Sequence, residues 1–483
     1  MTAFTNDNTD SYRYLGYKVV VPLSVRLILF LLLFPVWVNG QTAHYYFGTL
    51  HAHSGYSDGN KDSLVSGCST PLADFEYAKG SQQMDFLGIS EHNHLGAGMH
   101  KADYFKGIAE ANLANVDGDF VCLYGMEWGE IASGGHLIIY GVDSLIGWDN
   151  GNYHIYNAQE DYTGLFAKLA SRPNAFCYFA HPQTGDYNDL IGTVAYNAVS
   201  DKAIVGSPFR SGPAFSLDTT FSDPSSGNYL SKWFKALAKG YHLGMCLDHD
   251  THNTVFGRSQ MGRTAIIADT LTQASVLDAY HQMRMYATDD WNTEVTFSAN
   301  GHVMGSVVDA QGIPTISVGV ADPDLEEVAS ITLYYGVPGS GLTPTVLSSN
   351  TDSLSLTYTH TIEQDSTFYY YAKIVQADGD QIYTSPIWYT RDDYAAIAEP
   401  KQQGVKGLSV LPNPNAGTFV LRFETALPQS FPLEVFNCLG ECVYRESLDN
   451  VVGSFAKLVS LDGLAKGVYV LKVGDGMVRW VVE

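Results

Sequence analysis

Between residues 44 and 290, short apolar runs alternate with stretches in which apolar residues recur at helical spacing. The apolar runs predict strands at 45–50, 84–90, 120–127, 136–142, 175–180 and 242–248. The helical spacing predicts helices at 71–80, 100–114, 161–172, 230–240 and 271–285. Strands that alternate with helices over such a length predict an α/β fold with a mostly parallel sheet, either open or closed into a barrel.

The order of apolar and polar positions changes at residue 293. From 293 to 391, apolar and polar positions alternate strictly, and Gly, Pro, Asp and Ser separate the runs, which predicts an antiparallel β-sandwich. Residues 392–407 read as a linker, and 408–483 contain further short strands that form a third unit. The chain therefore divides into a barrel or open sheet at 44–290, a sandwich, a linker and a small C-terminal unit.

The N-terminus carries a targeting signal. Residues 27–38 form an apolar run that follows Arg26, and cleavage before Gln41 is plausible, so residues 1–40 are interpreted as a signal peptide. A helix needs about 20 apolar residues to cross a bilayer, so we expect no stable membrane span in the mature protein. An uncleaved membrane anchor is the alternative interpretation of this run.

Composition limits the possible partners. The chain has 483 residues and a formal net charge of −24 at pH 7, and 45% of its residues are hydrophobic. These values indicate folded domains rather than a disordered chain. A surface this acidic repels nucleic-acid backbones, so no long nucleic acid is expected as a partner.

Metal-type ligands stand at the ends of the predicted strands. The set consists of His51, His53, Asp58, His92, Glu127, His136, His181, Asp250 and His252. Because the carboxyl ends of parallel strands face one edge, we expect these side chains to converge. His94 and His249 are ambiguous, because each lies next to a better-placed candidate.

Imidazoles and carboxylates are the protein ligands of Zn, Mn and Fe. Nine such groups exceed what one ion needs, so the sequence predicts two or three divalent cations. A hydroxide that bridges two cations is a nucleophile at neutral pH, and a further cation stabilises charge in the transition state. The sequence contains neither a G-x-S-x-G elbow nor a P-loop lysine as a competing chemistry.

The motifs GTLHAHSGYSDG, GISEHNH, YGMEWGE, GGHLIIYG, FAHPQ and LDHDTHN resemble, in this order, those of the PHP (polymerase and histidinol phosphatase) superfamily. The stretch from MGRTAIIADT to the later SPIWY looks closest to the carbaryl-hydrolase-like bacterial branch. The resemblance implies a distorted (β/α)7 barrel at 44–290, which holds up to three metals. With the sandwich and the C-terminal unit, the expected fold class is α/β followed by two all-β units.

The resemblance also implies a ligand set for each metal. One ion would take His51, His53, Glu127 and Asp250, and a second would share Glu127 with His136 and His181. A third would take His92 and His252, with Asp58 at a position where many members have a ligand. Glu91 replaces the Asp that commonly precedes the histidine at position 92.

Catalytic roles are assigned to Glu127, Asp250 and Arg263. Arg263 follows the last ligand strand in the sequence GRT. Its guanidinium either donates to a substrate oxygen or pairs with a carboxylate of the same domain. The sequence leaves these two roles of Arg263 open.

The C-terminal unit has a second recognisable pattern. LPNPNAG from Leu411, then LEVFNCLGECVYRE, then LDGLAKGVYVLKV resemble the type A sorting domain of the type IX secretion system. This resemblance covers 408–483 and implies the secretion machinery as a partner. It also implies a secreted or cell-surface protein that crosses the outer membrane after its signal peptide has directed export.

Together these patterns predict a secreted metal-dependent hydrolase that acts on ester bonds. Phosphoester hydrolysis of a small or medium-sized substrate is the leading expectation. Carboxyl-ester or carbamate hydrolysis on the same cluster is the alternative among enzymes. A surface binding protein that keeps its metals without turnover is the alternative outside enzymes.

Overall fold

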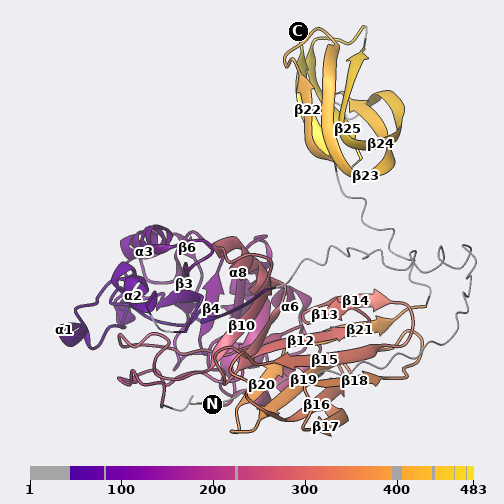
Figure 1. The fold of residues 1–483 in the computed structure, drawn as a ribbon. Helices are drawn as coiled ribbons and strands as arrows, with labels where there is room; N and C mark the ends of the chain where they lie inside the picture. Colours follow the sequence, from indigo (N-terminus) through magenta and orange to yellow (C-terminus); the bar gives the residue numbers. More distant parts are fainter. Residues whose placement is uncertain are drawn as a thin grey trace, which may run out of the picture.

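The computed structural model describes residues 44–80, 83–223, 227–393, 405–437, 441–461, 463–474 and 476–483. The predicted signal peptide, residues 1–40, and residues 394–404 of the predicted linker lie outside these ranges. Strand residues outnumber helical residues in the described chain (Figure 1). Among the described residues, none of the helices has the length and apolar character needed to span a bilayer.

One mixed sheet of 15 strands runs from the beginning of the described chain to Arg391. Its strands in the first part are β1 (His44–Thr49), β2 (Phe86–His92), β3 (Val121–Trp128), β4 (Leu137–Tyr140), β7 (Phe176–Phe179), β8 (Ile204–Pro208), β9 (Gly244–Cys246), β10 (Arg263–Ala268) and β11 (Met285–Thr288). Its later strands are β14 (Val307–Ala310), β16 (Val328–Gly336), β17 (Thr345–Thr351), β19 (Thr367–Gln376), β20 (Gln381–Thr384) and β21 (Ile387–Arg391). The spatial order is β14-β21-β19-β20-β11-β10-β1-β2-β3-β4-β7-β8-β9, and β16 and β17 extend from β19.

Helices connect the strands of the first part. They are α1 (Ser63–Ser66), α2 (Pro71–Ala78), α3 (Lys101–Ala114), α4 (Tyr162–Ala170), α5 (Asp186–Asp189), α6 (Ala198–Ala203), α7 (Leu230–Lys239) and α8 (Gln273–His281), with the 3-10 turn η2 (Leu95–Ala97). Helix α2 begins with Thr70 as its N-cap and Pro71 at its first position, a favourable start for a helix. A short ribbon of β5 (Ile146–Gly147) and β6 (Ile155–Tyr156) lies between β4 and α4 in the chain.

The prediction of a distorted (β/α)7 barrel is wrong. The sheet is mixed: β3 pairs with β4, β4 with β7, β1 with β10, and β10 with β11, all antiparallel. It also continues through β20 into the strands that follow residue 293, so the described chain is a predominantly β structure. Only eight residues, 129–136, separate β3 from β4, and a parallel return needs a crossover of a dozen or more. The apolar pattern predicted β1, β2, β3, β4, β7 and β9 but missed β8, β10 and β11, and it carries no information on strand direction.

A second, four-stranded sheet faces the later strands of the large sheet. It contains β12 (Glu294–Ala299), β13 (His302–Val303), β15 (Thr315–Ala321) and β18 (Ser355–Thr359), in the order β13-β12-β15-β18. Alternate residues of β15 are buried, and Ile316 and Val318 join Ile331 and Ile374 in the core between the two sheets. The period-two pattern of the sequence thus corresponds to one buried face and one solvent-exposed face of the strand.

The opposite face of β19 and β20 packs against the first part of the chain. The ring of Tyr371 lies 4.9 Å from that of Trp233 on α7, and the ring of Tyr383 lies 4.8 Å from that of Phe209. The two parts therefore share one aromatic core as well as one sheet.

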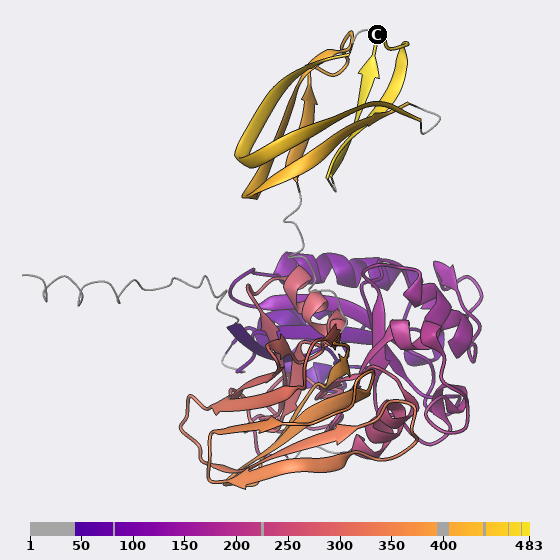
Figure 2. The same ribbon diagram turned by 90° about the vertical axis from the view of Figure 1, so that its right-hand side faces the viewer.

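The strands after residue 405 form a separate five-stranded sheet (Figure 2). Its strands are β22 (Lys406–Leu411), β23 (Thr418–Phe436), β24 (Cys442–Ser460), β25 (Gly467–Val473) and β26 (Gly476–Val482). It has its own core, in which Trp480 and Leu433 are fully buried.

Candidate metal centre

The strands of the first part bring the nine predicted ligands to one edge of the sheet. Strands β1, β2 and β3 run parallel, so the residues at their carboxyl ends meet there. Strand β4 runs antiparallel to β3, so His136, which precedes β4, lies beside Glu127 near the end of β3. The antiparallel return that excludes the barrel therefore leaves His136 at the same edge as the other ligands.

Glu127 is the centre of the group. Its side chain is buried, and neither carboxylate oxygen receives a hydrogen bond of suitable geometry from the described residues. Ring nitrogens of five histidines surround it: His51 at 3.3 Å, His53 at 3.2 Å, His92 at 3.2 Å, His136 at 2.9 Å and His181 at 3.2 Å. A buried carboxylate is costly unless it is paired, and no lysine or arginine forms an ion pair with it in the described chain.

These separations fit ligands that share cations. Ions of tetrahedral or octahedral geometry with bonds of 2.0–2.2 Å place neighbouring ligand atoms about 2.9 to 3.5 Å apart. Asp250 Oδ1 lies 3.1 Å from His51 Nε2 and 3.2 Å from His53 Nε2, within this range. One ligand atom from each of His51, His53, Glu127 and Asp250 lies within 4.8 Å of the others, as do those of His92, Glu127 and His136.

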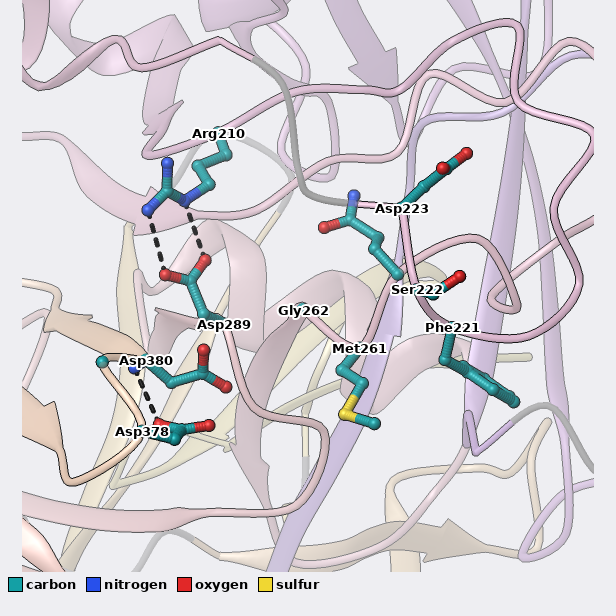
Figure 3. A pocket seen from close by; sticks show the side chains of 11 residues that line it. Arg210, Phe221, Ser222, Asp223, Met261, Gly262, Asp289, Asp378 and Asp380 are labelled. Atoms are coloured by element: carbon teal, nitrogen blue, oxygen red, sulfur yellow. Dashed lines mark hydrogen bonds and ion pairs between the residues drawn. The ribbon is translucent and has the colours of Figure 1, made fainter.

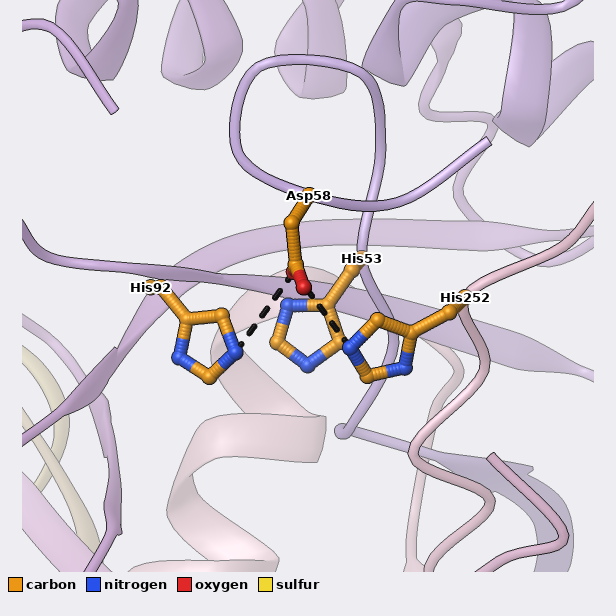
Figure 4. A group of neighbouring side chains, drawn as sticks. All are labelled: His53, Asp58, His92 and His252. Atoms are coloured by element: carbon orange, nitrogen blue, oxygen red, sulfur yellow. Dashed lines mark ion pairs between the residues drawn. The ribbon is translucent and has the colours of Figure 1, made fainter. Parts of the chain in front are cut away.

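A third group lies beside the first two, around Asp58 (Figure 4). Asp58 Oδ1 is 3.3 Å from His252 Nε2 and 3.5 Å from His92 Nε2, and His53 completes the group. Figure 4 shows the three rings gathered below the carboxylate. His53 and His92 therefore face two of the three groups each.

The protonation states of Glu127 and His92 favour cation binding. Burial opposes ionisation of Glu127, but the nearby rings of His136 and His51 hold the pKa of its carboxyl well below the usual range. Burial lowers the pKa of His92 to about 3, so this ring is neutral and its nitrogen lone pair is available. Burial also disfavours a charged His53, yet Asp250 and Glu127 raise its pKa to about 9. A cation must displace that proton on binding.

Two carboxylates that sequence reasoning left without a role orient the ligands. Asp248 Oδ2 lies 3.4 Å from Nδ1 of His51, whose Nε2 faces Glu127, and Tyr178 donates its hydroxyl to the other oxygen of Asp248 at 3.2 Å. A carboxylate behind a ligating imidazole fixes the orientation and tautomer of the ring. Asp248 lies in the same DHDTH segment as Asp250, and its position two residues before that ligand is the signal that could have identified it.

The second of these carboxylates is Glu91, which holds the loop that carries Asp58. Glu91 accepts hydrogen bonds from the hydroxyls of Ser54 and Ser57, and from the backbone amide of Ser54 at 3.1 Å. Burial raises the pKa of Glu91 to about 7, although these hydrogen bonds act in the opposite direction. Glu91 thus faces the loop rather than the imidazoles.

Arg263 does not lie with the ligands. Its side chain is fully buried, and it donates to the backbone carbonyls of Gln83, Gln260, Gly262 and Gly257. These contacts tie together the backbone around the start of β10. These hydrogen bonds run to backbone carbonyls, whereas the sequence suggested a substrate oxygen or a carboxylate as the partner.

The two ambiguous histidines lie at the margin of the centre. His249 donates through Nε2 to the carbonyl of Gly262 at 2.7 Å, away from the ligand group. His94 stacks on Trp148 with ring centroids 5.5 Å apart. His94 also lines a cavity of about 400 Å³ that opens onto Asp58, His92 and His136.

A second cavity, of about 420 Å³, lies where the first part of the chain meets the β19–β20 turn (Figure 3). Arg210 and Asp289 form a bidentate ion pair at one side, with nitrogen–oxygen distances of 2.8 and 3.1 Å. Asp378 and Asp380 face the same cavity, and none of the nine ligand residues lines it.

Comparisons with known proteins address the C-terminal unit. Residues 409–482 match the secretion system C-terminal sorting domain. No curated protein matches the chain.

Solved structures give only weak likenesses. The fibronectin(III)-like modules of Clostridium thermocellum CbhA are 15% identical, with 39% of this chain and 94% of that chain covered and a TM-score of 0.16. The FN1-FN3 domains of chicken CNTN1 are 9% identical (39% and 66% covered, TM-score 0.15). The tetra-tandem repeat in the extending region of a large adhesion protein is 13% identical (47% and 59% covered, TM-score 0.15). TM-scores this low do not define the fold of this chain.

The family match confirms the predicted sorting unit and, with it, the secretion machinery as a partner. The chain carries a secretion system C-terminal sorting domain at residues 409–482 and is exported through type IX secretion, to the cell surface or beyond it.

Proposed function

We propose that the protein is an exported metal-dependent hydrolase that holds two or three divalent cations, Zn, Mn or Fe, and cleaves phosphoesters. The observation that carries this proposal is the buried Glu127 carboxylate with five imidazole nitrogens within 3.3 Å. The order of the ligands along the chain, which resembles that of PHP proteins, supports it.

The residues divide into three overlapping sets. His51, His53, Glu127 and Asp250 would hold one cation, and Glu127 would share a second with His136, His181 and His92. Asp58 and His252 would hold a third with His53 or His92. Bound divalent ions supply Lewis acidity and lower the pKa of water to near neutrality.

The chain's own groups determine where a substrate enters. Asp58 is partly exposed and lies between the buried ligands and the 400 Å³ cavity, so an ester approaches from this side. Glu127 is ionised and buried, Asp250 is ionised and largely covered, and both fix the positions of the imidazoles around them. The tight burial of His51, His53 and Glu127 excludes bulk water from the inner part of the centre.

Charge favours an anionic ester. The carboxylates of Glu127, Asp58 and Asp250 carry about −3, and two or three divalent cations carry +4 to +6, so the centre has a net charge of roughly +1 to +3. A positive centre on an acidic protein concentrates the field at the entrance and attracts phosphoester oxygens.

One observation favours the alternative of carboxyl-ester or carbamate hydrolysis. The described residues that line the entrance cavity include Ile131 and Ala132 but no lysine or arginine. A neutral ester needs no additional cation beyond the metal centre, whereas many phosphate sites add arginine.

The test is turnover by the full chain after loading with Zn, Mn or Fe in turn. Metal-dependent release of p-nitrophenol from p-nitrophenyl phosphate or its diester is expected. Glu127→Gln should abolish both the release of p-nitrophenol and metal binding. Glu76→Gln, at an exposed position of helix α2, is the matched control and should leave both unchanged. Release from carboxyl or carbamate esters alone would support the alternative, and full metal loading without any turnover would contradict the hydrolase proposal.

A further inference from the structure

An aromatic side chain stands exposed next to the proposed metal centre. Phe215 is 63% exposed, and its ring centroid lies 4.8 Å from that of His252. Covering an exposed apolar side chain is favourable, and Phe215 differs from other exposed apolar residues in its ring contact with His252, a proposed ligand.

The backbone holds Phe215 in this position. The amide of His252 donates to the carbonyl of Ala214 at 2.8 Å, and the side-chain amide of Asn253 donates to the carbonyls of Phe215 and Ser216, both at 3.0 Å. Three consecutive carbonyls of the loop are thus tied to the segment that carries a proposed ligand. The backbone at Phe215 is therefore held relative to the centre, and the Phe215 side chain stays largely exposed.

Lys61 adds a positive charge at the same place. Its Nζ lies 5.5 Å from the centroid of the Phe215 ring and 3.2 Å from Asp58 Oδ2, and its backbone amide donates to the carbonyl of His252 at 3.0 Å. An aromatic face and an ammonium group are therefore held side by side at the partly exposed ligand Asp58.

We propose that Phe215 and Lys61 form the subsite for the organic part of the substrate, and that this part is an aromatic group carried by an anionic ester. The ring of the substrate stacks on Phe215, and Lys61 contacts its negatively charged oxygens while the ester lies at the metal centre. This inference rests on the proposed function, whose substrate class it narrows to aryl phosphoesters.

The test compares the effects of substitutions on KM for one substrate with an aromatic ring and one without. KM is measured for phenyl phosphate and for n-butyl phosphate with the metal-loaded full chain, Phe215→Ala and Lys61→Ala. Phe215→Ala should raise KM for phenyl phosphate by about 2- to 10-fold, the usual worth of one aromatic contact, and leave both kcat and the butyl ester unchanged. Lys61→Ala should raise KM for both esters. Leu217→Ala, 68% exposed on the same loop, is the matched control and should change neither.

A binding measurement separates this inference from the proposed function. Titration of the metal-loaded protein with phenylphosphonate and butylphosphonate, which are not hydrolysed, should show a preference for the phenyl compound that Phe215→Ala removes. Such a preference without any turnover would overturn the hydrolase proposal and keep the subsite. Turnover without a preference that depends on Phe215, or an equal effect of Phe215→Ala on both compounds, would overturn the subsite and keep the hydrolase.

Discussion

At the scale of single residues, the molecule places one ionised carboxylate where water does not reach and surrounds it with imidazoles. Burial of Glu127 is costly, and the groups that hold it ionised in the described chain are imidazoles rather than lysine or arginine side chains. Divalent cations would compensate the negative charges of Glu127, Asp250 and Asp58 together. Bound cations would therefore stabilise this group of side chains better than ion pairs among its own members.

Asp248 offers a test at this scale. Asp248→Asn keeps the size of the side chain but removes the charge that faces Nδ1 of His51, so the imidazole loses its fixed orientation. We expect metal affinity to fall by about 10- to 100-fold with little change in folding. Competition with a chelator of known affinity measures this, and Asp278→Asn on the exposed side of α8 is the control. An unchanged affinity would show that Asp248 does not orient the ring.

The sequence predicted which histidines and carboxylates gather at one edge better than it predicted residues that act through packing. Histidines and carboxylates at strand ends are visible in the sequence because their chemistry is rare at such positions. The direction in which an arginine side chain points cannot be deduced from the sequence pattern. Arg263 opens β10, and whether it faces substrate or backbone carbonyls depends on how residues 257–262 fold over it, which no local pattern records.

At the scale of elements, the positions of most strands in the first part were predictable, those of β8, β10 and β11 were missed, and strand directions were not predictable. The strands expected at 84–90, 120–127 and 175–180 correspond to β2, β3 and β7. The residues at the ends of β2 and β3 meet because these strands run parallel. Strand β4 turns back along β3, which was not foreseen and which replaces the expected barrel with a mixed sheet. A strand buried on both faces reads as an apolar run whichever way it points.

The turn between β19 and β20 provides a prediction about pH. Burial and the neighbouring Asp378 and Asp289 raise the pKa of Asp380 from its usual 3.8 to about 7 (Figure 3). Because the folded state binds this proton more tightly than the unfolded state, the contribution of Asp380 to stability is present below about pH 4 and is lost as the pH rises through 7.

Asp380→Asn should therefore raise the melting temperature at pH 8 and change it little at pH 4.5. Thermal unfolding at the two pH values measures the difference. Asp309→Asn, on the exposed edge strand β14, is the control and should behave the same at both. Equal effects of Asp380→Asn at pH 8 and pH 4.5 would show that burial of this carboxylate does not cost stability.

At the scale of the whole molecule, the sorting domain is a distinct unit with a core of its own. We expect the secretion machinery to recognise the surface of this folded sheet. Trp480→Ala, which empties a fully buried site, should cost about 3–5 kcal/mol and retain the protein inside the cell envelope. Met477→Ala, 66% exposed on the same strand, should be exported normally.

Fractionation of a host with type IX secretion, followed by immunodetection, distinguishes these cases. Deletion of residues 405–483 gives the reference for complete retention. If the Trp480→Ala protein reaches the cell surface at the normal level, recognition does not require the folded sheet.

The pairing of β11 with β20 joins residues 44–288 to the strands that follow in one uninterrupted ladder. A gene cut at residue 290 would leave the full edge of β11 without its neighbour, and open edges of this kind recruit strands from other chains. Duplication or exchange of residues 44–288 alone would therefore yield a protein prone to aggregate. We expect the two halves to be inherited together, as one evolutionary unit, while the sorting domain remains free to be exchanged between exported proteins.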